Sequence, residues 1–180
     1  MSRAALSALA DRIDGVCGLI GRVAAWAVLA MVIVQAAIVV LRYLFGFGSL
    51  WMQESLVYCH AALVLFAAGW TLSVNGHVRV DIFYADASPS TKARVDLAGS
   101  LLLLIPFMVA VIWFSWPYAA RAWALREGSR EAGGIPLVFL LKSFIPAFAA
   151  LMVLQGLAQA LRAALTLATA NPNATSGRAS

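Results

Sequence analysis

The chain has 180 residues, of which 63% are hydrophobic and only 12% are charged. Soluble domains are about 45–50% apolar and about 25% charged, so this composition indicates a protein embedded in lipid. The net charge of +5 comes from basic residues scattered at the ends of apolar stretches, which argues against a nucleic-acid partner. Four spans of about 20 residues leave only tails and short connections, which excludes a globular catalytic domain.

The first apolar stretch lies between Arg22 and Arg42 and predicts a membrane-spanning helix over residues 23–41. Its 19 residues, at 1.5 Å each, extend about 28 Å, close to the ~30 Å thickness of the hydrocarbon core. The stretch is longer than the roughly 7–15 residues of a cleavable signal core, so we expect it to be retained. Residues 1–22 are assigned to a short cytoplasmic segment that precedes it.

A short turn over residues 46–49 leads to the second predicted span, residues 55–74, which stops at an Asn-Gly pair. The segment that follows, residues 77–91, mixes charged, polar and apolar residues. Ser88 and Pro89 then combine an N-cap residue with a helix-initiating proline. We therefore expect the next helix to begin near residue 89.

The second half of the chain predicts two more spans, over residues 97–120 and 136–161. Pro106 lies inside the first of them and predicts a kink. A charged, glycine-containing loop over residues 126–134 separates the two spans. Residues 163–180 are predicted to form a disordered cytoplasmic tail, because they have little to bury.

The predicted fold class is an all-α integral membrane protein, with a four-helix transmembrane domain over residues 23–162. Positive residues concentrate on the cytoplasmic side of membrane proteins. The face with both termini and the middle connection carries eight Lys and Arg residues, against five on the other face. This bias predicts that both termini are cytoplasmic.

The middle of every predicted span lacks Asp, Glu, Lys and Arg. Ionisable groups at that depth cost about 2.5–3.5 kcal/mol on insertion scales and mark substrate or proton pathways, so the spans show no transport machinery of their own. No catalytic residue, cofactor or metal site is predicted, and the isolated Cys17 and Cys59 are interpreted as packing residues. Six uncharged polar residues lie at depth and are interpreted as groups that hydrogen-bond between helices: Gln35, His60, Ser100, Ser115, Gln155 and Gln159.

Four short motifs then follow one another along the chain, at the end of the first span, the start of the second, directly after the second and within the fourth. Their characteristic residues are Arg42, Trp51, Glu54, His77, Arg79, Asp81, Lys142 and Pro146. In this order and topology, the chain resembles the small membrane subunit of the tripartite ATP-independent periplasmic (TRAP) transporters over about residues 21–162.

The resemblance implies a multi-pass subunit of the bacterial inner membrane in a one-to-one complex with a large multi-span TRAP subunit. In that family the large subunit moves the substrate with sodium ions, and a periplasmic substrate-binding protein captures an organic acid. The small subunit is a non-catalytic scaffold, so the motif residues would be partner-contacting or structural positions. The family often has a second acid beside the one that matches Glu54, whereas this chain has Gln53 and Ser55 on either side of it.

The motif charges also have a direct physical interpretation. Arg42 and Glu54 lie at adjacent span ends, and we expect an ion pair between them, strengthened by partial desolvation, to fix the short turn. Two separately solvated charges are the alternative. Residues 76–81 form either a docking patch for the partner or a positive anchor at lipid headgroups. Lys142 either snorkels to the interface or joins a buried ion pair.

Two other functions are left open by the sequence. A membrane-anchor subunit of an oxidoreductase with haem or quinone would use His60 or the two cysteines, although a second membrane-depth histidine is missing for a bis-histidine haem. A small autonomous exporter would need an acid at membrane depth, and the predicted spans contain none.

Overall fold

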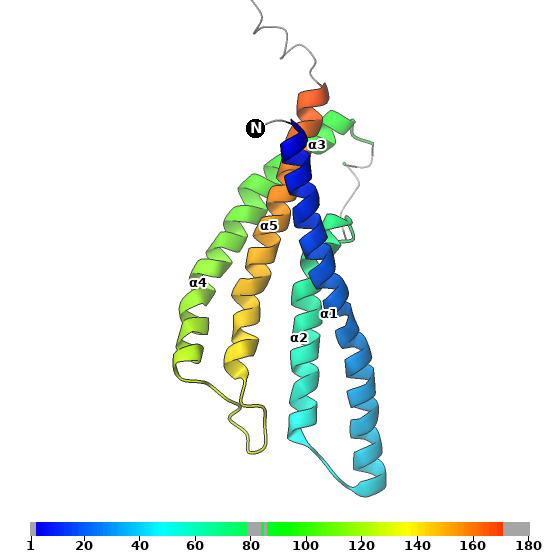
Figure 1. The fold of residues 1–180 in the computed structure, drawn as a ribbon, viewed down its shortest axis with the longest axis vertical. Coiled ribbons are helices and arrows are strands. Elements are labelled where there is room, and N and C mark those ends of the chain that lie inside the picture. The colour runs from blue at the N-terminus through cyan, green and yellow to red at the C-terminus, as the bar shows by residue number, and fades with distance from the viewer. Residues whose placement is uncertain (1–2, 79–83, 85, 171–180) are drawn as a thin grey trace, which may run out of the picture.

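The computed structural model describes residues 3–78, 84 and 86–170 (Figure 1). The elements in chain order are α1 (Arg3–Phe45), α2 (Leu50–Ser73), α3 (Pro89–Ala98), the π-helical turn η1 (Gly99–Leu104), α4 (Ile105–Ala124) and α5 (Val138–Ala170). Four helices are long and apolar enough to cross a membrane: α1, α2, the continuous helix α3–η1–α4, and α5. The predicted all-α fold with four spans is therefore confirmed.

Local sequence explains where the helices begin and end. The Ser88 hydroxyl accepts a hydrogen bond from the N–H of Thr91 at 3.2 Å, and Pro89 occupies the first turn of α3, as predicted. Helix α2 ends just before Asn75, whose φ of 53° lies in the left-handed region. The loop after α4 contains Gly133, whose φ of 82° also favours glycine.

Two helices extend beyond their predicted boundaries. Helix α1 begins at Arg3 rather than near residue 23, and α5 continues through Ala170. The disorder predicted from residue 163 is therefore wrong for residues 163–170, while residues 171–180 lie outside the described part. The two extensions stabilise each other, because the Arg3 guanidinium donates to the carbonyl of Ala168 at 3.2 Å and Ala163 is buried.

At Pro106, where a kink is predicted, the helix contains a π turn directly before the proline. In η1 the N–H of Ile105 donates to the carbonyl of Ser100, five residues earlier. Proline lacks an N–H, and its ring crowds the preceding turn of a helix. A single π turn accommodates the missing donor and the ring without interrupting the helix.

The helices form two antiparallel pairs, α1 with α2 and α4 with α5 (Figure 1). The pairs meet near the two ends of the described chain and diverge towards the linker of residues 46–49 and the loop of residues 125–137 (Figure 1). A small core of Met108, Ala149 and Met152 joins α4 to α5. The buried residues of α1 all belong to its first half: Ala10, Cys17, Gly18, Gly21 and Ala24.

Candidate functional site

A cluster of polar groups fixes the loop between α4 and α5, and we call it the loop cluster. Glu54, in the second turn of α2, accepts hydrogen bonds from Ser129 Oγ at 2.5 Å and from the Ile135 N–H at 2.6 Å. Hydrogen bonds to an ionised carboxylate are among the stronger ones in proteins. The carboxylate therefore ties α2 to a loop that lies 75 to 81 residues further along the chain. The loop cluster consists of Glu54, Glu127, Ser129, Ile135 and Lys142.

Lys142 occupies the second turn of α5 and completes the loop cluster. Its Nζ lies 2.6 Å from Oε2 of Glu127 and 4.1 Å from the centroid of the Tyr118 ring. The lysine and glutamate side chains are 17% and 28% exposed, so the pair is partly shielded from solvent. The structure thus gives Lys142 an ion pair within its own chain, supported by a cation–π contact.

The predicted ion pair between Arg42 and Glu54 is wrong. The Glu54 carboxylate instead accepts hydrogen bonds from Ser129 and Ile135. Arg42 is exposed on α1. The physical reason is the divergence of α1 and α2 towards the linker (Figure 1), since a four-residue linker joins the helix ends without holding them parallel. Trp51 lies beside the linker and is also exposed.

A second cluster joins α1 to α5 at the opposite end of the bundle, and we call it the terminal cluster: Asp11, Asp14, Gln155 and Arg162. The Arg162 guanidinium pairs with Asp14 and lies 2.8 Å from Asp11. Gln155 Nε2 donates to Asp14 Oδ1 at 2.7 Å. The two acids were not singled out from the sequence, although their i, i+3 spacing places them on one helix face.

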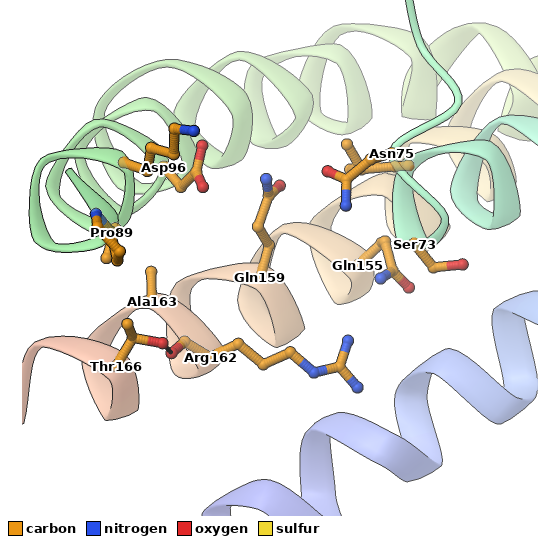
Figure 2. Close-up of a pocket in the computed structure, with 12 residues that line it drawn as sticks. Ser73, Asn75, Pro89, Asp96, Gln155, Gln159, Arg162, Ala163 and Thr166 are labelled. Atoms are coloured by element: carbon orange, nitrogen blue, oxygen red, sulfur yellow. Dashed lines mark hydrogen bonds between the residues drawn. The ribbon is translucent and has the colours of Figure 1, made fainter. Parts of the chain in front are cut away.

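A polar cavity of about 340 Å³ lies beside the terminal cluster, between the end of α2, α3 and α5 (Figure 2). Its lining carries charges of both signs, with Lys92 and Asp96 from α3 and Arg162 from α5. Figure 2 shows the Gln159 side chain between Asp96 and Asn75, with Gln155 beside Ser73. Among the described residues, no three His, Cys, Asp or Glu side chains are grouped to hold a metal ion. The lining of the cavity thus offers several groups that donate or accept hydrogen bonds.

The other predicted positions are not brought together. His77 follows α2, and its Nε2 lies 3.3 Å from the carbonyl oxygen of Ala68. Arg79 and Asp81 lie outside the described residues, so their roles stay predictions. Pro146 lies within α5 and lines an apolar groove of about 660 Å³ against α4. Of the six motif residues that the structure describes, Glu54 and Lys142 both bond to the loop between α4 and α5.

Four helices that are long and apolar enough to cross a membrane define a multi-pass membrane protein. Residues 31–166 match the family described as tripartite ATP-independent periplasmic transporters, DctQ component. The chain belongs to this family, as the resemblance predicted.

One relative is the C4-dicarboxylate TRAP transporter small permease protein DctQ of Vibrio cholerae serotype O1, which is 27% identical over 99 residues. The alignment covers 52% of this chain and 42% of that protein, so it spans less than half of the relative's length. Membership of the family favours the transporter hypothesis over the oxidoreductase anchor and over the autonomous exporter.

Proposed function

We propose that the chain is the non-catalytic small membrane subunit of a TRAP-type secondary transporter for organic acids in a bacterial inner membrane. It forms a one-to-one complex with a large multi-span subunit, which moves the substrate with a sodium gradient. A periplasmic binding protein delivers the substrate. The name of the Vibrio relative specifies C4-dicarboxylates, which are therefore the first organic acids to test.

The distribution of charge in the described helices supports a scaffold role. The loop cluster and the terminal cluster hold charged groups in ion pairs at opposite ends of the bundle. A chain that carried an organic acid itself would be expected to present a cation at mid-membrane depth. Contacts that fix both ends of the bundle instead suit a rigid support for a moving partner.

The same arrangement supports a topology. The two ends of the described chain lie at one end of the bundle, with the terminal cluster, as expected for an even number of spans (Figure 1). With the excess of Lys and Arg on that face, the proposal places both termini in the cytoplasm and the loop cluster in the periplasmic half.

Reconstitution into proteoliposomes tests the proposed function. Vesicles that contain this chain and its large subunit, supplied with the binding protein, are expected to accumulate a labelled C4-dicarboxylate when an inward sodium gradient is imposed. Omitting this chain should abolish uptake although the large subunit is inserted. Uptake by this chain alone, or full uptake without it, would speak against the proposal.

A further inference from the structure

Two polar side chains lie exposed inside the predicted membrane spans. Gln35 of α1 and His60 of α2 are both exposed on the surface of the chain. In the predicted spans over residues 23–41 and 55–74, Gln35 lies six residues and His60 five residues from the boundary next to the linker, which corresponds to about 9 Å and about 8 Å inside the hydrocarbon core. Neither side chain forms a hydrogen bond or ion pair with another described residue.

The other four polar residues predicted at depth are at least half-buried in the chain. Ser100 and Gln155 are buried. Ser115 donates to the carbonyl of Ile112 at 3.4 Å, and Gln159 is half-buried at the polar cavity. Of these six residues, the two that point outward without a partner therefore both belong to the hairpin of α1 and α2.

Gln35 and His60 belong to one continuous surface, which we call the hairpin face. Gln35 lines a groove of about 650 Å³ between α1 and α2, in which Leu56 is the contribution of α2. His60 follows Leu56 by one helical turn, so it lies on the same side of α2. The exposed Val57 and Val64 continue this strip of α2.

The rest of the described chain does not cover the hairpin face. Residues 25–45 of α1 contain no buried residue, so this part of α1 is less covered by the rest of the described chain than its first half is. Exposed valine and leucine are compatible with lipid, but glutamine and histidine need hydrogen-bond partners that acyl chains do not provide. A polar side chain on a neighbouring transmembrane helix provides such a partner.

We propose that the hairpin face is the docking surface for a transmembrane helix of the large subunit, which presents a hydrogen-bonding side chain to Gln35 and His60 inside the hydrocarbon core. This inference rests on the proposed function, which supplies a large membrane subunit as the partner. The Gln35 amide offers both donors and an acceptor, and the His60 imidazole offers at least one N–H donor, so the side chain of a Ser, Thr, Asn or Gln in the partner matches either.

Photocrosslinking in native membranes tests the location of this surface. A photoreactive amino acid at Val57 or Val64 of the full chain is expected to crosslink to the large subunit. Phe107 and Phe114 of α4 are matched controls, because they are 64% and 77% exposed, and the same amino acid there is expected to label lipid.

Crosslinks to the large subunit that are as efficient from the α4 controls as from the hairpin face would overturn the inference. Crosslinks from the hairpin face to a second copy of this chain would do the same. Either result leaves the proposed function standing, provided that the large subunit is recovered with the chain. If no large membrane protein is recovered with any variant, both the proposed function and this inference fail.

A double variant, Gln35→Leu with His60→Leu, tests the polar contact itself. Both side chains are exposed, so leucine at these positions leaves the internal packing of the chain intact. Each lost interhelical hydrogen bond is expected to weaken the complex roughly threefold to thirtyfold, measured as the large subunit retained on the tagged chain in increasingly harsh detergent. Val64→Leu, on the same strip, should retain the large subunit fully. Equal retention by the double variant would overturn the proposed polar contact.

Discussion

Replacing Gly21 by alanine tests how closely α1 packs on α2. A Cβ at Gly21 would lie 2.5 Å from Cβ and 3.0 Å from Cγ of Trp70, whereas carbon atoms in contact lie about 3.5–4.0 Å apart. The nearest atom is the Trp70 Cβ, which is fixed to its backbone, so the helices must separate. Overpacking of this kind costs about 1–3 kcal/mol, against about 1 kcal/mol gained from the higher helix propensity of alanine.

Gly15→Ala is the matched control, because a Cβ at Gly15 of the same helix meets no atom within 4 Å. We expect Gly15→Ala to raise the free energy of unfolding by up to about 1 kcal/mol. Gly21→Ala should lower it by up to about 2 kcal/mol, after the propensity gain is subtracted from the overpacking cost. SDS-induced unfolding of the chain in mild detergent, followed by circular dichroism, measures both. Equal stability of the two variants would refute the close approach of α1 and α2.

Three further changes test the polar clusters. Glu54→Ala should accelerate hydrogen exchange at the Ile135 amide and weaken assembly with the large subunit, with a smaller effect for Glu54→Gln, which keeps one acceptor oxygen; unaltered exchange would contradict the loop cluster. Glu127→Gln should make Lys142, which Glu127 pairs with, more reactive towards an amine label. An unchanged labelling rate of Lys142 would argue that the ion pair is not formed. Asp14→Ala should lower the free energy of unfolding in SDS by about 1.5–3 kcal/mol, whereas Asp11→Ala, at an exposed pair, should lower it by less than about 1 kcal/mol; equal losses would contradict the terminal cluster.

The parts of the fold that were predicted correctly depend on residues close together in the chain. The length of an apolar stretch sets a span, and this property needs no knowledge of the partner helices. Ser88 and Pro89 begin a helix through bonds within a single turn. The charged loop after α4 is likewise a local feature, since it interrupts the apolar pattern over residues 126–134.

The contacts that build the two clusters depend on how the helices tilt and rotate, which local patterns do not determine. Glu54 was assigned to Arg42 across a short turn, but its partners come from a loop 75 to 81 residues away. Arg162 was interpreted only as a topology signal, and its partner Asp11 lies 151 residues earlier. The length of α5 was underestimated for a similar reason, because its last turns are stabilised by the start of α1.

Purification of the tagged chain from its native membranes in mild detergent, with quantitative mass spectrometry of the proteins that accompany it, most directly tests the central claim that it supports a larger transport subunit. We expect a large multi-span membrane protein in a ratio of about one to one. A chain that purifies alone, particularly with haem absorbance, would contradict the claim and make the oxidoreductase anchor the leading hypothesis.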